Sequence, residues 1–306
     1  MIKWGLSDIP PILFSALRYT IASCILLFIV FAKKSYRIGI ERKDRKFWIL
    51  VFLYGFFFIF LTQGAQYISL ALLPATELTL ILNLTFIIVA LLSAAFLKEQ
   101  IRPIQLLLII TSVFGLFLFF YGKIETELSM TGLIVAVFCM LANAMSVLLG
   151  RILNRTVSAP AVVITTLSIT FGSIFLFFTS LMTESFPNLS LGAIMTLLWL
   201  AVVNTVIAFV LWNKSQQTLR AVDSTLINNT MTPQIVFLAF LFLHEVPTGL
   251  ELAGIGILVI SIALMQFCQA KIELRGENIS LPLLSEYKRT IRPEQQEQER
   301  KSESRL

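Results

Sequence analysis

Nine long apolar stretches, separated by short polar segments, form the main pattern along this chain. They lie near residues 9–32, 47–70, 74–97, 103–122, 131–150, 159–182, 191–212, 222–243 and 250–269. A helix needs about 20 apolar residues to cross the hydrocarbon core of a bilayer. The stretches lack the period-2 alternation of a membrane β-barrel, and only helices or closed barrels satisfy their backbone groups in lipid. The pattern therefore predicts an all-α, polytopic transmembrane helical bundle.

Composition agrees with this prediction. Apolar residues make up 57% of the chain and charged residues 14%, whereas typical soluble domains carry about 25% charged residues. Cys24, Cys139 and Cys268 each lie alone in or at the edge of a span, so we interpret them as buried apolar side chains. His244 is the only histidine and there is no Gly-rich phosphate loop, so the sequence predicts no metal site, no cofactor and no ATP-driven mechanism.

Basic residues follow a membrane topology, so the net charge of +6 is not a signal for nucleic-acid binding. Segment 33–46 contains seven Lys and Arg residues, and the positive-inside rule assigns it to the cytoplasm. Two basic residues occur in each of the loops 98–102, 151–158 and 213–221. None occurs in the loops 71–73, 183–190 and 244–249, and loop 123–130 has only Lys123. This alternation predicts a multi-pass protein of the cell membrane with a cytoplasmic C-terminus and an external N-terminus.

An odd span count with an external N-terminus suggests that one helix is missing. The chain begins MIKWGLSDIPP, which leaves almost nothing before the first span. One further helix would give ten spans and would place both termini inside. We therefore expect the first helix of a ten-helix protein to be missing, and a genuine nine-span protein is the alternative.

The first half of the chain is repeated in the second half after a shift of 146 residues. The polar matches under this shift are Ser69 with Ser215, Asn83 with Asn229 and Glu99 with Glu245. The charge pattern places Glu99 inside and Glu245 outside, so the two copies are inverted in the membrane. Inverted repeats are common in secondary transporters, where the substrate site lies near the midplane between the halves.

This repeat predicts two units of five helices each. The first unit covers residues 1–122 and lacks its first helix, and the second covers residues 131–269. Residues 270–306 are polar, mixed in charge and rich in Gln and Glu, which predicts a disordered cytoplasmic tail.

Three segments of the chain carry a family resemblance. They are IPPILFSALRYTIASCILL, QYISLALLPATELTLILNLTFIIVALLSAAFLKEQI and LINNTMTPQIVFLAFLFLHEVPTGLELAGIGILVIS. In this order they resemble the second helix and the third-to-fourth and ninth-to-tenth helix hairpins of the EamA family in the drug/metabolite transporter superfamily. The resemblance covers roughly residues 5–270 and implies a ten-helix inverted-repeat carrier of small metabolites. One departure is that Ile87 stands at the first-half position equivalent to Pro233.

Arg18 and Glu77 are candidate functional residues in the first half. Arg18 is the basic residue placed deep in an apolar span, where a charge costs about 2.5–3.5 kcal/mol on insertion scales and so faces a cavity or a partner. It either binds an anion or gates a central cavity, or it makes structural hydrogen bonds. Glu77 follows Pro74 by one turn, which fits helix-end stabilisation; the alternative is that it accepts a coupling proton.

Asn83 and Asn229 are the stronger candidates for substrate contact, because a pseudo-two-fold axis would bring equivalent positions face to face. Pro233 predicts a helix kink that frees the carbonyl of Asn229. The alternative for these polar side chains is interhelical hydrogen bonding, worth about 0.6 kcal/mol on average. The predicted substrate-cavity residues are Arg18, Gln66, Glu77, Asn83, Trp199, Asn228, Asn229, Thr232 and Pro233.

These features predict a secondary-active transporter of small metabolites, such as amino acids, sugars or drug-like compounds, that works by alternating access between two inverted repeats. The expected partners are a small-molecule substrate and the lipid bilayer, without nucleic acid; proton coupling and a homodimer stay open. The main alternative is a non-transporting membrane scaffold or receptor. A lipid-modifying membrane enzyme is less favoured because the spans lack clustered His, Asp and Glu residues.

Overall fold

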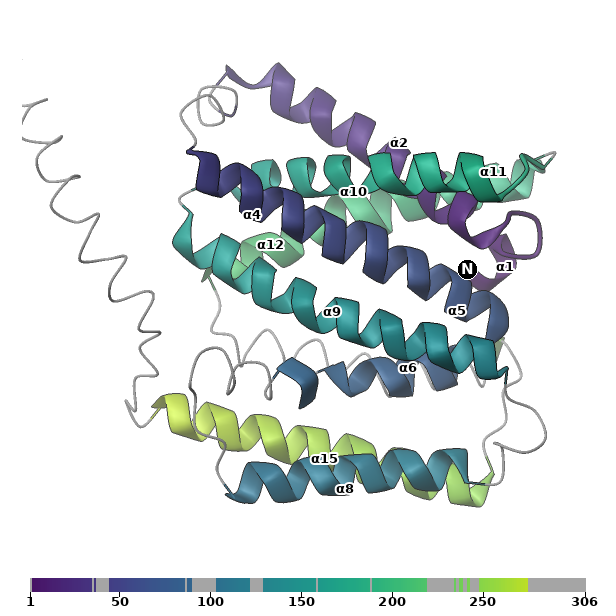
Figure 1. Cartoon of the computed structure of the whole chain (residues 1–306), viewed down its shortest axis with the longest axis vertical. Helices are drawn as coiled ribbons and strands as arrows, with labels where there is room; N and C mark the ends of the chain where they lie inside the picture. The colour runs from purple at the N-terminus through teal and green to yellow at the C-terminus, as the bar shows by residue number, and fades with distance from the viewer. Residues whose placement is uncertain are drawn as a thin grey trace, which may run out of the picture.

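The protein is described here by a computed structural model. It describes residues 2–34, 44–85, 87–89, 103–121, 129–157, 159–187, 189–218 and 248–274, with single positions at 36, 234, 237, 238, 241 and 242. Within these ranges every regular element is a helix (Figure 1). The predicted all-α helical bundle is therefore confirmed. Most of the predicted span 222–243 and of the tail 270–306 lies outside the described residues.

Five helices of the described residues are long and apolar enough to cross a membrane. They are α2 (Pro11–Ala32), α4–η1–α5 (Arg45–Gly55, Phe56–Gln63, Gly64–Leu72), α9 (Met130–Thr156), α10 (Ala161–Thr183) and α11–η2–α12 (Leu191–Ala201, Val202–Ile207, Ala208–Thr218). The other helices are α1 (Ile2–Gly5), α6 (Ala75–Asn83), α8 (Pro103–Phe120) and α15 (Gly249–Leu274). Each predicted span other than 222–243 overlaps one of these helices.

Local sequence signals explain where the helices begin. Pro10, Pro74 and Pro160 stand directly before α2, α6 and α10, at a position where a missing backbone N–H costs nothing. The hydroxyls of Ser129 and Ser190 accept hydrogen bonds from the N–H three residues later, both at 3.1 Å, at the starts of α9 and α11. Such caps satisfy donors that have no partner inside the helix.

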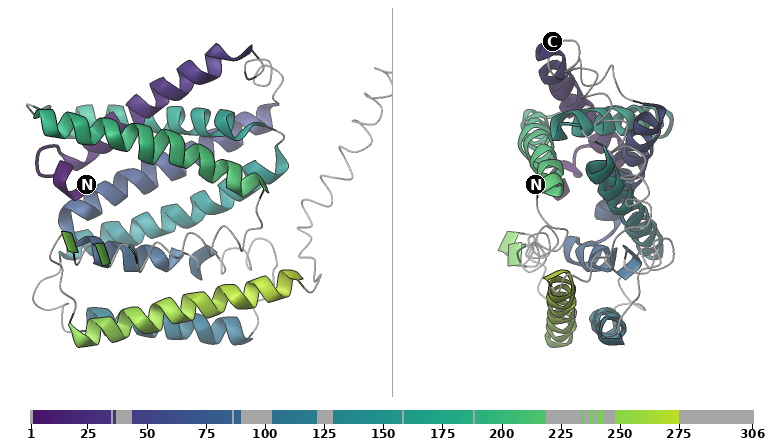
Figure 2. Two further views of the ribbon diagram at one scale, coloured as in Figure 1. Left: turned by 180° about the vertical axis from the view of Figure 1, so that it is seen from behind. Right: turned by 90° about the vertical axis from the view of Figure 1, so that its left-hand side faces the viewer.

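Helices α2 and α10 pack against each other in opposite directions in the upper part of the bundle as drawn in Figure 1. They begin 150 residues apart, and the order of buried and exposed positions along α2 recurs along α10 with a difference at the first residue alone. Equivalent helices α4–α5 and α11–α12 also run in opposite directions, as do α8 and α15 (Figures 1 and 2). This course agrees with an inverted repeat, whereas the boundaries of the two units stay a prediction.

Both halves contain a π-helical segment at the same place. Segment η1 begins at Phe56 and η2 begins at Val202, which is the shift of 146 residues found in the sequence. The hydroxyl of Thr62 donates to the carbonyl five residues back at 2.8 Å, and that of Thr205 does the same at 3.0 Å. π-helical segments are rare and occur frequently at functional sites.

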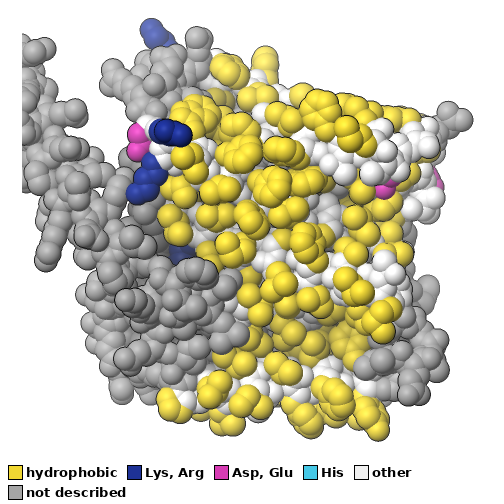
Figure 3. Space-filling view, in the orientation of Figure 1, with side chains coloured by type: hydrophobic (Ala, Val, Ile, Leu, Met, Phe, Trp, Pro, Cys, Tyr) yellow, Lys and Arg dark blue, Asp and Glu magenta, His cyan; other side chains and the backbone are white. Residues whose placement is uncertain are grey.

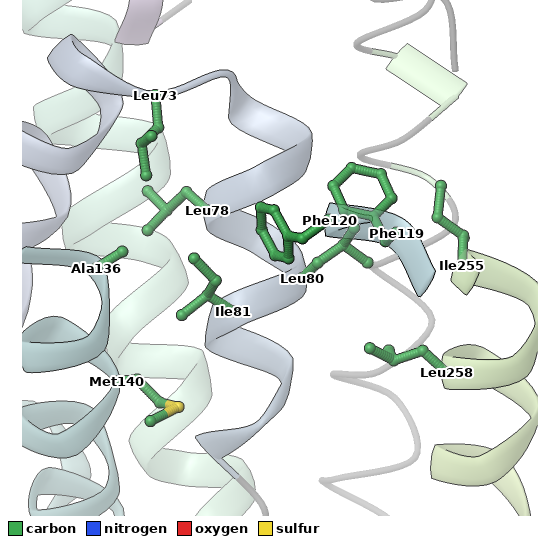
Figure 4. Packing of buried hydrophobic residues seen from close by; sticks show 10 residues of the cluster. All are labelled: Leu73, Leu78, Leu80, Ile81, Phe119, Phe120, Ala136, Met140, Ile255 and Leu258. Atoms are coloured by element: carbon green, nitrogen blue, oxygen red, sulfur yellow. The ribbon is translucent and has the colours of Figure 1, made fainter. Parts of the chain in front are cut away.

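Glycines allow several helices to approach closely. A Cβ atom at Gly172 of α10 would lie within 3.0 Å of the Gly55 carbonyl oxygen of α4, and one at Gly254 of α15 within 3.0 Å of the Gly115 carbonyl oxygen of α8. Leu78, Leu80 and Ile81 of α6 pack in an apolar cluster with residues of α8, α9 and α15 (Figure 4). Small residues and apolar packing are the usual basis of helix association in membranes.

The surface of the bundle is suited to lipid. In the view of Figure 3, the broad face is apolar and the drawn Lys and Arg side chains lie along one edge. The exposed large apolar residues come from most of the helices, including Phe28, Phe114, Phe178 and Leu211. A bilayer rather than water is therefore the environment of this face.

Candidate functional site

A buried arginine joins the two halves of the chain. Arg18 is 3% exposed and lies seven residues into α2, about 10 Å along its axis. Its Nη1 donates to the hydroxyl of Tyr67 at 2.7 Å, its Nε donates to the hydroxyl of Thr205 at 2.8 Å, and its Nη2 donates to the carbonyl of Asn204 at 3.0 Å. The contacts link α2 and α5 of the first half to η2 of the second.

The described acceptors around Arg18 are neutral. In the described part of the chain, no carboxylate forms a hydrogen bond or an ion pair with the guanidinium. The guanidinium carbon also lies 5.1 Å from the centre of the Tyr19 ring, which provides a cation–π contact. A guanidinium has five N–H donors, of which three are used here. The cation is therefore held by oriented dipoles, and this geometry fits the structural alternative for Arg18 as well as it fits a gate.

The polar network extends along the contact between α2 and its neighbours. The Tyr19 hydroxyl donates to Oε1 of Gln63 at 2.8 Å. The hydroxyls of Ser23 on α2 and Thr170 on α10 share a hydrogen bond of 2.8 Å. Interhelical bonds of this kind let two halves bind each other specifically within lipid, where apolar packing alone is not directional.

A second polar network lies within the second half. Nδ2 of Asn154 donates to Oδ1 of Asn213 at 2.9 Å, and Nδ2 of Asn213 donates to the hydroxyl of Thr165 at 3.0 Å. Asn213 stands 146 residues after Tyr67, so both networks use the equivalent position of the repeat. Asn213 lies on α12 and Tyr67 on α5, which follow the π-helical segments of their halves.

Glu77 and Asn83 lie apart from the Arg18 network. Both belong to α6, and Glu77 is 2% exposed in its first turn. The helix packs against α9 and contributes to the apolar cluster with α8 and α15 (Figure 4). In the described part of the chain, neither residue hydrogen-bonds to Arg18. The predicted candidates therefore belong to at least two separate places in the bundle.

The other predicted cavity residues differ in placement. Gln66 is half-buried on α5, next to Tyr67. Trp199 is 54% exposed on α11, so it lies on the outside of the described bundle. The remaining predicted residues, Asn228, Asn229, Thr232 and Pro233, lie outside the described residues.

The networks contain residues that the sequence did not single out for this purpose. They include Tyr67, Thr205 and Asn213, which bind partners on other helices. The alignment of Tyr67 with Asn213 under the shift of 146 residues was a usable signal, because both are hydrogen-bonding side chains in apolar spans. Thr205 had no such signal, since Ile59 stands at its equivalent position. No group of three or more His, Cys, Asp and Glu side chains suited to a metal occurs among the described residues.

The fold, with its antiparallel pairs of equivalent helices and its long apolar helices, is that of a multi-pass helical membrane protein. The EamA-like transporter family model matches residues 1–121 and 130–267, and the chain belongs to this family. The chain is 27% identical to the uncharacterized transporter YetK of Bacillus subtilis (strain 168) over 275 residues, 84% of this chain and 81% of that protein. It is 24% identical to the uncharacterized transporter YoaV of the same organism over 251 residues, 80% and 83% of the two chains.

A solved structure shares the fold. It is described as a crystal structure of protein, and it matches with a TM-score of 0.65 at 16% sequence identity, covering 89% of this chain and 92% of its own. The family and the relatives support a membrane-embedded transporter of the drug/metabolite type. The family points to a transporter and not to an enzyme. Its environment is a lipid bilayer, and it acts on a small molecule.

Proposed function

We propose that this chain is a secondary-active carrier that moves a small metabolite, such as an amino acid, a sugar or a drug-like compound, across the cell membrane by alternating access. The observation that carries the proposal is the pairing of α2 with α10. The two helices are equivalent, run in opposite directions and bury the same positions against their surroundings. At a contact between equivalent helices, each half can take up the arrangement that the other half had. This exchange is the basis of alternating access in inverted-repeat carriers.

The polar contacts across this interface suit a movement of one half against the other. Ser23 with Thr170 joins α2 to α10, and Arg18 with Thr205 joins α2 to η2 of the second half. Each is a short side-chain contact that can break and re-form. Segments η1 and η2 supply irregular backbone at equivalent points of the two halves, where a helix can change its direction. The halves can therefore rock while the helices themselves stay intact.

In this proposal the substrate binds between the halves, and Asn83 and Asn229 contribute equivalent side chains to the cavity. The test is uptake of labelled amino acids and sugars into proteoliposomes by the wild-type chain, by Asn83→Leu and by Asn229→Leu. Each variant should reduce uptake at least tenfold with normal insertion of the protein, because the leucine offers no hydrogen bond to a polar substrate. Asn204→Leu is the matched control, since the Asn204 side chain is exposed on η2.

The outcomes of this test separate the alternatives. Normal uptake by both variants would remove the asparagines from the site. Absence of uptake across the whole panel would favour a scaffold or receptor. The proposal also includes a cytoplasmic C-terminus, proton coupling through the buried carboxyl group of Glu77, and a homodimer. The charge pattern of the loops supports the first of these, and the buried position of Glu77 supports the second.

A further inference from the structure

One carboxylate ties the two halves together at the end of the bundle where α2 begins. Glu184 directly follows α10, and its carboxylate accepts hydrogen bonds from the backbone N–H of Ile12 at 3.1 Å and from that of Leu13. These N–H groups belong to the first turn of α2, where no carbonyl of the same helix is available. The positive end of the helix dipole also favours an anion there. Glu184 therefore forms a charge-assisted link between α10 and α2.

A second polar contact lies on the same side of the bundle. The Ser190 hydroxyl at the start of α11 donates to Oδ2 of Asp8, just before α2, at 2.9 Å. The Ser7 hydroxyl donates to the other carboxylate oxygen of Asp8 at 3.0 Å. Glu184 thus holds the first turn of α2, and Ser190 holds the segment just before it.

The opposite end of the same helix pair does not have this link. The shift of 150 residues that relates α2 to α10 places Lys34 at the position equivalent to Glu184. An ammonium group donates hydrogen bonds and cannot accept them, so Lys34 cannot bind the backbone N–H groups of the first turn of α10. The N-cap residues of both helices, Pro10 and Pro160, have no capping side chain of their own, so only a residue from elsewhere could bind these N–H groups. Within the described residues, the carboxylate link therefore exists at one end of the pair alone.

We propose that Glu184 is a gate tether, which closes the bundle at the start of α2 and must be released before the carrier can open there. Because the described residues of the other end carry no equivalent link, the tether biases the resting protein toward opening at the Lys34 end. This inference rests on the alternating-access mechanism proposed above. By the charge pattern of the loops, the tethered end faces the outside and the resting carrier faces the cytoplasm.

The test measures how fast a reporter thiol near each end reacts with a membrane-impermeant maleimide in the full chain. Cys24, Cys139 and Cys268 are first replaced by alanine. Ser15→Cys then reports on the tethered end, because Ser15 is buried one turn inside the Glu184 contact. Thr166→Cys reports on the Lys34 end, where Thr166 is buried one turn inside α10 and its hydroxyl bonds to its own helix.

Glu184→Ala should raise the labelling rate of Ser15→Cys roughly three- to tenfold and lower that of Thr166→Cys, because a population shift opens one end as it closes the other. Glu184→Gln should give a smaller change, since its amide oxygen still accepts a hydrogen bond but carries no charge. Thr183→Ala is the matched control, because its hydroxyl donates to the Thr179 carbonyl within α10. It should leave both rates unchanged.

Three outcomes would overturn the tether. They are unchanged labelling of Ser15→Cys in Glu184→Ala, faster labelling at both ends, which means general loosening, and an equal effect of Thr183→Ala. The labelling needs no substrate, so it judges the tether even if no compound is transported. Conversely, wild-type transport with unchanged labelling in Glu184→Ala would remove the tether and leave the proposed function in place.

Discussion

Removal of the Tyr67 hydroxyl tests whether Arg18 pins the two halves of the bundle together. In Tyr67→Phe, the ring that packs edge-on against Phe14 at 5.3 Å is kept, and the acceptor 2.7 Å from Nη1 of Arg18 is lost. The change therefore removes one hydrogen bond and almost no volume. The other two bonds of Arg18, to Thr205 and to the carbonyl of Asn204, remain.

The magnitude follows from the environment of the bond. Interhelical hydrogen bonds in membrane proteins contribute about 0.6 kcal/mol on average and at most about 1.7 kcal/mol. A charged donor in a buried site belongs at the upper end of this range, and Arg18 is 3% exposed. Tyr67→Phe should therefore lower the free energy of unfolding by about 1.5 kcal/mol.

Arg18→Met changes the free energy of unfolding through two opposing contributions. It removes three hydrogen bonds, which together contribute about 2–5 kcal/mol at the same values. It also removes the cost of about 2.5–3.5 kcal/mol for a charge at membrane depth. The net change in the free energy of unfolding should therefore lie within about 2 kcal/mol of zero. A near-neutral result would mean that the arginine is kept for the contact between the halves and not for stability.

The assay is reversible unfolding in mixed micelles of the wild-type chain, both single variants and the double variant. The coupling energy between Tyr67→Phe and Arg18→Met should be about 1–1.5 kcal/mol, since residues in direct contact are not additive. Additive effects, within about 0.3 kcal/mol, would show that the two side chains do not interact and would refute the reasoning.

Two further predictions concern packing. Gly172→Ala should destabilise the protein by about 1–3 kcal/mol, because the new Cβ meets the Gly55 carbonyl oxygen. Gly192→Ala is the control, since its new Cβ lies 3.9 Å from the nearest atom and should change stability little. Equal effects of the two variants in the same unfolding assay would contradict the close helix contact. The Thr20 hydroxyl is buried without a hydrogen-bond partner among the described residues. Thr20→Val should therefore leave the free energy of unfolding unchanged or raise it by up to about 1 kcal/mol. A decrease of more than about 1 kcal/mol would show that the hydroxyl binds a partner.

The helices could be predicted from the sequence because the bilayer makes their formation a local matter. In lipid, each backbone N–H must find a carbonyl within its own segment, so a long apolar stretch is sufficient to indicate a helix. Helix starts were also readable locally, as with Pro10 before α2 and Ser190 before α11. The shift that aligns Ser69 with Ser215 indicated the repeat, because rare polar residues in apolar spans leave few accidental matches.

Interactions between helices were decided by the tertiary structure. Arg18 was recognised as a buried charge, but its partners Tyr67 and Thr205 lie 49 and 187 residues away, and many other polar residues of the spans were equally available. The same holds for Glu184, which binds backbone N–H groups of α2 and so has no side-chain partner to search for. In lipid, the backbone hydrogen bonds of each helix are satisfied within that helix. Its own sequence therefore carries little information about which neighbouring helix it packs against. That choice depends on close approaches such as Gly172 on Gly55, which exist only after the helices have packed.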